Sequence, residues 1–320
     1  MATKSKKRAK GSSRDRTASK ETLTSAPTQP ANGSGPPPSN LDMLRRMYSA
    51  MLKCRMMGER VRDGDAVLAY DLAAGHEAIV TGASIDLKPE DTIAASQRNF
   101  AARIATGAPL KHLLKEGSAN DSAECRVAII SCRCASSGAA SSAAFLADPF
   151  NLASGLALSH KLEKKTNVVV AFWDEDASSL EASHEALKFA GIHKLPIIYV
   201  TRSAGLDDPG RRKHSALEEF SFLAKDYGFP SILVDGKDVV AVWRAAQESI
   251  HRARNGSGPT LIECQTEPAS FKDPLTHLQH YMSRRGAWDD GWKQQIVDQI
   301  DTEIEQAMGE STPKVGHDVR

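Results

Sequence analysis

The sequence predicts an α/β fold in which a parallel β-sheet is covered by helices on both faces, behind a disordered N-terminal tail. Two continuous apolar runs, 168–173 and 196–200, flank an amphipathic stretch at 178–190. Continuous apolar runs are typical of strands buried on both faces, and a helix between two of them lets the strands run parallel. Because the alternation continues to residue 264, we expect one sheet built from repeated β-α-β units.

Length and composition are ordinary for a globular protein. The chain has 320 residues, 41% hydrophobic and 25% charged, with a formal net charge of +1. We expect a single domain over residues 41–320. A charge so close to neutrality gives the whole chain no attraction to nucleic acid or to an anionic membrane. No run approaches the roughly 18 apolar residues of a membrane-spanning helix, and the start lacks the apolar segment of a secretory signal, so we expect a cytoplasmic protein.

Residues 1–40 form the expected tail. They are rich in Ser, Thr, Lys, Arg, Gly and Pro and contain almost no large apolar side chain. Such a segment cannot bury enough surface to offset the entropy lost on ordering, so we expect it to be disordered. Its first half is basic and could contact phosphate groups or an acidic partner. A solvated tail is the favoured interpretation, and nucleic-acid binding is the third and weakest of the functions considered.

Two helices are expected at the start of the folded part. Asn40 is a good N-cap for a helix whose apolar residues begin at Leu41. A second helix pattern follows Gly75-His76-Glu77-Ala78 and ends before Lys88-Pro89. We interpret His76 as a packing or capping residue, not a metal ligand.

The stretch 117–148 gives the weakest pattern, with a short strand expected at 127–130. It contains Cys125, Cys132 and Cys134, whose spacing lacks the paired C-x-x-C units and the nearby His pair of a zinc site. Buried small residues are therefore favoured over zinc. The chain has five cysteines, an odd and scattered set that argues against a disulfide framework.

The second half carries the clearest signals. Ser178 and Glu181 form a capping box for the helix at 178–190, and Gly191 stands where a left-handed C-terminal residue is expected. A helix ending near Tyr227, a strand at 232–234, a helix at 238–254 and a strand at 260–264 complete the pattern. Ligands of such sheets bind at the carboxyl ends of the strands. This rule directs attention to 173–176 and 201–204, which we expect at one edge of the sheet.

Ordered blocks of sequence carry a resemblance to a known family. They are Gly75-His76-Glu77-Ala78, Leu87-Lys88-Pro89-Glu90-Asp91, Val168-Val169-Val170-Ala171-Phe172, His184-Glu185-Ala186-Leu187-Lys188-Phe189-Ala190, Lys194-Leu195-Pro196-Ile197-Ile198-Tyr199-Val200, Tyr227-Gly228-Phe229-Pro230, Val234-Asp235-Gly236-Lys237-Asp238-Val239 and Gly258-Pro259-Thr260-Leu261-Ile262-Glu263. From about Leu41 to about Met308 the chain resembles the alpha subunit of the thiamine-diphosphate-dependent decarboxylating (first) component of 2-oxo acid dehydrogenases, of the pyruvate and branched-chain type, as a divergent member. The resemblance implies the thiamine-diphosphate-binding fold.

The resemblance also implies a cofactor site. Family members hold thiamine diphosphate and Mg²⁺ with Gly-Asp-Gly at a strand end and a later Asn-Asn pair; the Asp and the second Asn ligate the metal, and the glycines let backbone N–H groups approach the diphosphate. In this chain the first motif becomes Asp174-Glu175-Asp176 and the pair becomes Ser203-Ala204. Where the family has Tyr-Arg-Asp-His, this chain has Gln97-Arg98-Asn99-Phe100 and keeps the phosphate-binding Arg98. By resemblance, the family positions for cofactor binding are Arg98, Glu175, Asp176, Ala177, Ser203 and Ala204, and Glu175 is the remaining metal-ligand position.

These substitutions predict weak cofactor binding. One added unit charge at 4 Å from the diphosphate costs about 4 kcal/mol at an effective dielectric constant of ~20, on the order of a thousandfold in affinity. Ala204 has no ligand atom. We assign no catalytic residue, because the family's Gly-Gly-Ser-Met-His stretch has no counterpart in 117–148 and its His-Ser loop is shortened to 270–274.

Alternatives exist for the acidic residues 174–176. A solvated turn that caps the following helix is favoured by the helix dipole, and a hard-cation site would lack a second ligand segment. His184-Glu185 begins an H-E-x-x-H pattern, but Lys188 stands at the second His position. Arg202 replaces an acidic family position, and we expect its guanidinium to pair with Glu175 or Asp174 in place of the metal.

Two functional classes follow. The chain is either an enzyme subunit that acts on a 2-oxo acid with a lipoyl disulfide as acceptor, together with a beta subunit, or a non-catalytic assembly or regulatory subunit. Both imply a hetero-oligomer or self-association. No membrane partner is expected.

Overall fold

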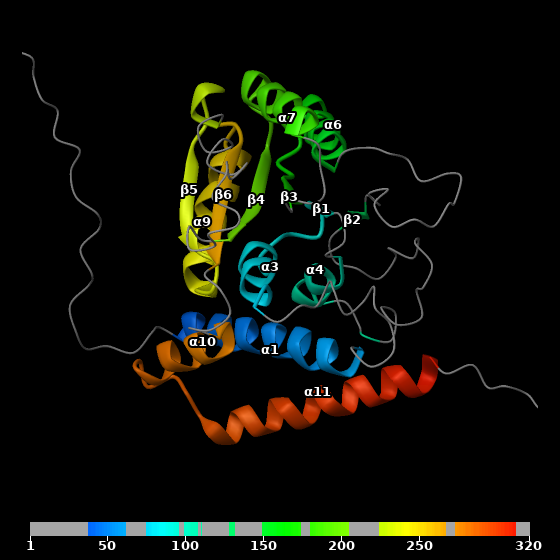
Figure 1. The fold of residues 1–320 in the computed structure, drawn as a ribbon, viewed down its shortest axis with the longest axis vertical. Coiled ribbons are helices and arrows are strands. Elements are labelled where there is room, and N and C mark those ends of the chain that lie inside the picture. The colour runs from blue at the N-terminus through cyan, green and yellow to red at the C-terminus, as the bar shows by residue number, and fades with distance from the viewer. Residues whose placement is uncertain are drawn as a thin grey trace, which may run out of the picture. The chain divides into compact units, whose positions relative to one another are not determined.

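The computed structural model describes residues 38–61, 75–95, 99–107, 110, 128–131, 149–173, 180–204, 224–266 and 273–311, all within one compact unit, Gly35–Arg320. These residues form a six-stranded sheet with the order β2-β1-β3-β4-β6-β5, in which every neighbouring pair is parallel (Figure 1). The strands are β1 Thr92–Ala95, β2 Ala128–Ser131, β3 Val169–Trp173, β4 Ile197–Ala204, β5 Ser231–Asp235 and β6 Thr260–Thr266. The predicted parallel sheet is confirmed.

Helices cover both faces of this sheet, as predicted. Alternate residues of one strand point to opposite faces, and in β4 Ile198 and Val200 join one buried cluster whereas Ile197 and Tyr199 join another. The first cluster includes α1 Pro38–Val61, α3 Glu77–Ser84 and α9 Val239–Arg254. The second includes α6 Pro149–Leu162 and α7 Leu180–His193 (Figure 1). Two separate cores therefore hold the sheet between them.

The first helix, α1, begins two residues before its expected cap. The expected N-cap Asn40 lies inside α1, which starts at Pro38. Proline is favoured in the first turn because its fixed φ suits a helix and its missing N–H would have no partner there. The apolar spacing was interpreted correctly, since Leu44, Met47, Tyr48 and Met51 are buried. The buried residues of α1 pack mainly against other helices, α3 among them.

Helices α3 and α9 pack against each other on the same face of the sheet. A Cβ added to Gly82 would lie 2.9 Å from the Cβ of Val242, so the two helices approach at this glycine. Asp238 caps α9 by accepting hydrogen bonds from the backbone N–H groups of Val240 at 2.9 Å and Ala241 at 3.1 Å. The expected start of this helix is confirmed.

Helix α7 corrects the interpretation of Gly191. This glycine lies inside α7, which continues to His193, and the left-handed position belongs to Lys194, with φ 44°. A Cβ at Gly191 would lie 2.5 Å from the carbonyl oxygen of Tyr227, so glycine is required here for close approach and not as a cap. The proposed capping residue Ser178 lies outside the described residues. Of Glu181 the structure describes only the backbone.

Three elements were not predicted, and several boundaries differ. No sequence pattern predicted strand β1, helix α4 Asn99–Ala105 or helix α6. Strand β2 confirms the strand expected at 127–130. Helix α3 ends at Ser84, before the expected stop at Lys88-Pro89. Near Tyr227 a helical segment ends at Asp226, as expected.

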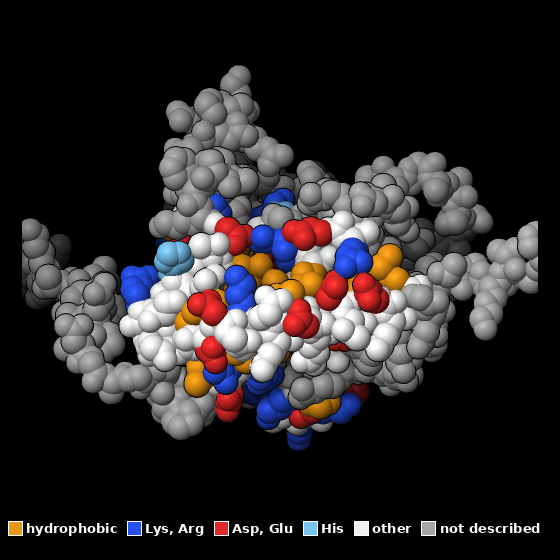
Figure 2. Space-filling model, turned by 90° about the horizontal axis from the view of Figure 1, so that it is seen from below, with side chains coloured by type: hydrophobic (Ala, Val, Ile, Leu, Met, Phe, Trp, Pro, Cys, Tyr) orange, Lys and Arg blue, Asp and Glu red, His pale blue; other side chains and the backbone are white. Residues whose placement is uncertain are grey.

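The C-terminal part forms two helices, α10 Pro274–Ser283 and α11 Asp290–Ser311. Helix α11 lies along α1, and ion pairs join Lys53 to Glu303 at 2.6 Å and Arg60 to Asp301 at 2.5 Å (Figure 1). Seen from below, hydrophobic side chains lie among charged ones on this side of the molecule (Figure 2). Among the described helices, none combines the length and apolar character that crossing a bilayer would require.

Candidate functional site

The carboxyl ends of β3 and β4 lie at one edge of the sheet. Trp173 at the end of β3 is in register with Thr201 of β4. Strand β4 continues beside β6, where Ala204 is in register with Thr266. The end of β3 therefore lies beside β4 at this edge, as the parallel topology predicted.

The predicted cofactor positions are only partly within the described structure. Arg98, Glu175, Asp176 and Ala177, together with Asp174, lie outside the described residues. Ser203 and Ala204 are the last two residues of β4, and their backbone is in register with Gln265 and Thr266 of β6. The expected pairing of Arg202 with Glu175 or Asp174 stays a prediction for the same reason.

Arg202 contacts His76 at this edge. The guanidinium Nη1 of Arg202 lies within hydrogen-bond distance of the imidazole Nε2 of His76, between β4 and the start of α3. A guanidinium has only donors, so Nε2 is the acceptor in this contact. His76 occupies the N-cap position of α3, but its side chain makes no capping hydrogen bond. Of the two expected roles, capping is therefore wrong for this side chain.

A second ionic group begins at the next residue. Glu77 is 4% exposed and forms an ion pair with Arg55 of α1, which also contacts Asp273 at 2.6 Å. The other carboxylate oxygen of Glu77 accepts a hydrogen bond from the backbone N–H of Gly75 at 2.6 Å. This network ties the start of α3 to α1 and to the start of α10.

Burial opposes the charged form of Arg55, but the nearby carboxylates of Glu77 and Asp273 raise the pKa of its guanidinium. Burial likewise opposes ionisation of Asp273, yet hydrogen bonds from Thr276 and the Arg55 charge hold the pKa of this carboxyl below its usual value. Asp273 also caps α10 through the backbone N–H of Thr276 at 2.9 Å. Arg55 and Asp273 are therefore both charged near neutral pH.

No sequence pattern predicted the Arg55 network. Its members are separated by 22 and 218 positions, so no local signal brings them together. One signal was present for Asp273, because Asp followed by Pro is typical of an N-cap followed by the first helical residue. That signal predicts the helix start but not the ion pair.

Metal and thiol chemistry have little support within the described residues. In this part of the chain, no three His, Cys, Asp or Glu side chains gather as a metal site would require. Cys54 and Cys264 are buried and form no disulfide, and burial raises the pKa of Cys264 far above its usual value. Cys125, Cys132 and Cys134 lie outside the described residues, so the zinc alternative stays untested.

Comparison with known proteins places this geometry in a family. Residues 45–268 match the family of the dehydrogenase E1 component. The chain is 30% identical over 288 residues to the alpha subunit of acetoin:2,6-dichlorophenolindophenol oxidoreductase of Bacillus subtilis, covering 84% of this chain and 86% of that protein. It is 31% identical over 180 residues to the 2-oxoisovalerate dehydrogenase subunit alpha of the same organism, covering 49% of this chain and 54% of that protein.

A third relative is the pyruvate dehydrogenase E1 component subunit alpha of Staphylococcus aureus, 28% identical over 183 residues, with 50% of this chain and 49% of that protein covered. A candidate thiamin diphosphate-dependent enzyme from Mycobacterium smegmatis is similar among solved structures at a TM-score of 0.39 and 16% identity, covering 60% of this chain and only 32% of that one. The matched family and the acetoin relative span most of the folded chain. The chain therefore belongs to the dehydrogenase E1 component family and is similar to its alpha subunits.

Proposed function

We propose that this chain is an alpha-type subunit that works with a beta subunit, and that it binds thiamine diphosphate with Mg²⁺ weakly or not at all. The observation that carries the proposal is the end of β4, where Ala204 stands at the position expected for the second metal ligand. Mg²⁺ requires oxygen ligands, and an alanine side chain supplies none. The residues at this end of the strand do not fit a diphosphate–magnesium complex.

The contact between Arg202 and His76 supports the proposal. By resemblance, His76 replaces a glutamine and Arg202 replaces an acidic residue. A glutamine amide donates to a carboxylate, whereas here the guanidinium donates to an imidazole. The two substitutions touch and are complementary to each other, and together they replace a negative group by a positive one. A fixed positive charge beside the metal position opposes binding of a divalent cation.

Within this proposal a non-catalytic assembly or regulatory role is favoured over full catalysis of 2-oxo acid decarboxylation. The relatives are named as alpha subunits, and an alpha-type fold that keeps its partner surface would still assemble. A cytoplasmic hetero-oligomer is the corresponding setting. Binding of nucleic acid by the basic residues 4–20 is the weakest alternative and would appear as steep salt dependence.

Isothermal titration calorimetry tests the proposal directly. We expect the purified chain, alone or with a co-expressed beta chain, to show no thiamine diphosphate binding in the presence of Mg²⁺ below about 100 µM. A variant carrying Asp174→Gly, Glu175→Asp, Asp176→Gly, Arg202→Glu, Ser203→Asn and Ala204→Asn returns the expected family residues at both motifs and serves as the matched comparison. It should bind more tightly by at least an order of magnitude.

A low-micromolar dissociation constant for the unaltered chain, equivalent to about −8 kcal/mol, would contradict the proposal. Failure of this six-residue variant to bind would instead show that substitutions outside the two motifs also prevent binding. Co-purification of the beta chain separates loss of cofactor from loss of assembly.

A further inference from the structure

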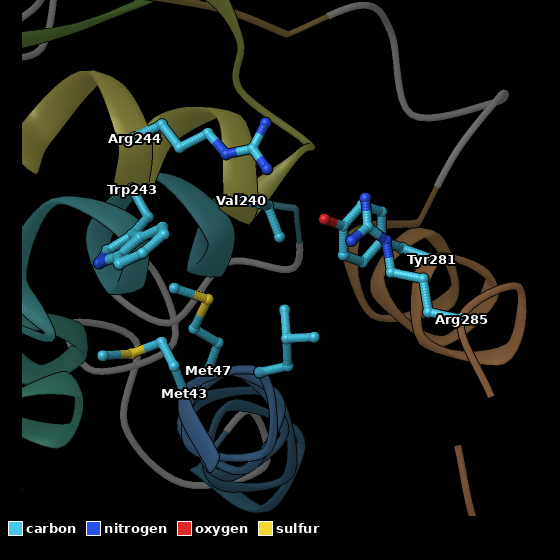
Figure 3. Close-up of a pocket in the computed structure, with 8 residues that line it drawn as sticks. Met43, Met47, Val240, Trp243, Arg244, Tyr281 and Arg285 are labelled. Atoms are coloured by element: carbon cyan, nitrogen blue, oxygen red, sulfur yellow. The ribbon is translucent and has the colours of Figure 1, made fainter. Parts of the chain in front are cut away.

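A small apolar recess lies away from the sheet edge, between α1, α9 and α10 (Figure 3). Its volume is about 50 Å³. Leu44 and Met47 of α1 and Val240 of α9 are buried and form its floor. Sites for whole small molecules usually enclose about 300–1,000 Å³. This recess has room for a single aliphatic side chain and not for a metabolite.

The walls of the recess are aromatic and held in place. Trp243 donates its indole N–H to Asp86 at 2.9 Å, and Asp86 also accepts from Gln247 at 3.1 Å. On the opposite side, the guanidinium of Arg285 lies 4.4 Å from the centre of the Tyr281 ring. Because both aromatic walls have fixed partners, the recess is formed before anything binds, and binding loses little side-chain entropy.

The rim carries positive charge. Arg244 from α9 and Arg285 from the end of α10 extend toward the mouth of the recess from two sides (Figure 3). Both are exposed, and among the described residues neither forms an ion pair with a carboxylate. Elsewhere in the same region Arg46, Arg55 and Arg60 each have one. The two rim guanidiniums therefore remain available to an incoming carboxylate.

We propose that this recess is a docking site for an acidic segment of a partner protein, which inserts one aliphatic side chain between carboxylates that meet Arg244 and Arg285. Its lining contains Met43, Met47, Trp243 and Tyr281 beside the two arginines, the residue types enriched at protein interfaces. Methionine side chains adapt to different aliphatic shapes. The charge of the rim selects an acidic partner over a basic or neutral one. The inference does not depend on cofactor binding.

Methyl resonances of methionine give a direct test on the full chain. The protein has eight methionines, of which Met43 and Met47 line the recess while Met51, Met57 and Met282 are fully buried elsewhere. With ¹³C-methyl-methionine labelling, titration with the peptide acetyl-Asp-Glu-Leu-Glu-Asp-amide should shift the Met43 and Met47 signals in a saturable way. The signals of Met51, Met57 and Met282 should stay in place.

Matched probes and variants define the chemistry. Replacing the peptide leucine by glycine, or its acidic residues by lysine, should weaken binding at least tenfold. Arg285→Glu should do the same, whereas Arg284→Glu, one residue away and outside the recess lining, should leave affinity within about twofold. The unshifted resonances of the buried methionines verify that each variant is folded.

Three results would overturn the inference. One is the absence of any shift at Met43 and Met47 up to millimolar peptide. Another is equal binding of the lysine peptide, which would remove the role of the two arginines. The third is an equal response to 4-methyl-2-oxopentanoate alone, which would make the recess a site for small carboxylates instead of a protein segment.

Discussion

Charged side chains have different partners at the two edges of the sheet, where the strands begin and where they end. At the amino edge, the fully buried Asp91 accepts hydrogen bonds from Arg254 at 2.6 Å and from the backbone N–H groups of Lys88 at 2.8 Å and Val168 at 3.0 Å. At the carboxyl edge, the guanidinium of Arg202 contacts the imidazole of His76 instead of a carboxylate. Because the buried Asp91 is held by three donors, we expect the amino edge to contribute more to stability than the carboxyl edge.

Asp91→Ala should have the largest effect on stability. The change leaves the Arg254 guanidinium, 15% exposed, without its carboxylate and removes the acceptor of two backbone N–H groups. Breaking a buried ion pair by removing one partner destabilises by about 3–5 kcal/mol. Urea unfolding followed by circular dichroism measures the loss. Asp226→Ala, at an exposed position, is the control and should be within about 0.5 kcal/mol of the parent protein. Equal losses in the free energy of unfolding for the two variants would contradict a special contribution of Asp91 at the amino edge.

Arg202→Ala tests the carboxyl edge. If the guanidinium pairs with the acidic residues at 174–176 in place of a metal, its removal strands their charge, and we expect a loss of about 3 kcal/mol. Glu175→Gln should restore part of this loss, and a double-mutant cycle in urea unfolding measures the coupling. His76→Gln in the same series separates the contribution of the imidazole contact.

A change in the free energy of unfolding near zero for Arg202→Ala would contradict the hypothesis that this arginine replaces the metal. Strict additivity with Glu175→Gln would contradict it as well. A half-exposed arginine that interacts only at the surface contributes at most about 1 kcal/mol. The acidic residues would then again be candidates for binding a cation.

Deletion of residues 1–37 should have the smallest effect. These residues lack large apolar side chains apart from Met1 and Leu23, so they add little to a core. The deletion ends before Pro38, where α1 begins. Differential scanning calorimetry should give a melting temperature within about 2 °C of the full chain, since a 1 kcal/mol change shifts proteins of this size by a few degrees. A drop of several degrees in the melting temperature would show that residues 1–37 also stabilise the fold.

The sequence predicted those parts of the fold that have strong local signals. Helix α9 has a capping Asp238 and an apolar stripe, and strands β3 and β4 are continuous apolar runs. Strand β1 has only four residues, two of them alanine, and so offers no period. Helix α6 is rich in small and apolar residues and has little contrast between its faces. Gly191 was misinterpreted because close approach to Tyr227 depends on tertiary packing.

The site was predictable in position but not in contacts. Parallel topology by itself requires the ends of β3 and β4 to meet at one edge of the sheet. The contact of Arg202 with His76 joins residues 126 positions apart, and neither local pattern nor resemblance identifies it. Contacts of this kind depend on how α3 packs beside the sheet, which no local pattern encodes.

The pairing of α1 with α11 has a consequence for synthesis of the chain. Tyr48, 2% exposed, is covered by Trp288 and Trp292, with ring centres 5.0 and 5.7 Å away. Helix α1 leaves the ribosome before Trp288 and Trp292 are made, so this tyrosine is shielded from water only later. Until then the nascent chain exposes an apolar face that chaperones or a co-translated partner can bind. Shielding of Tyr48 thus depends on residues that follow β6, the last described strand of the sheet.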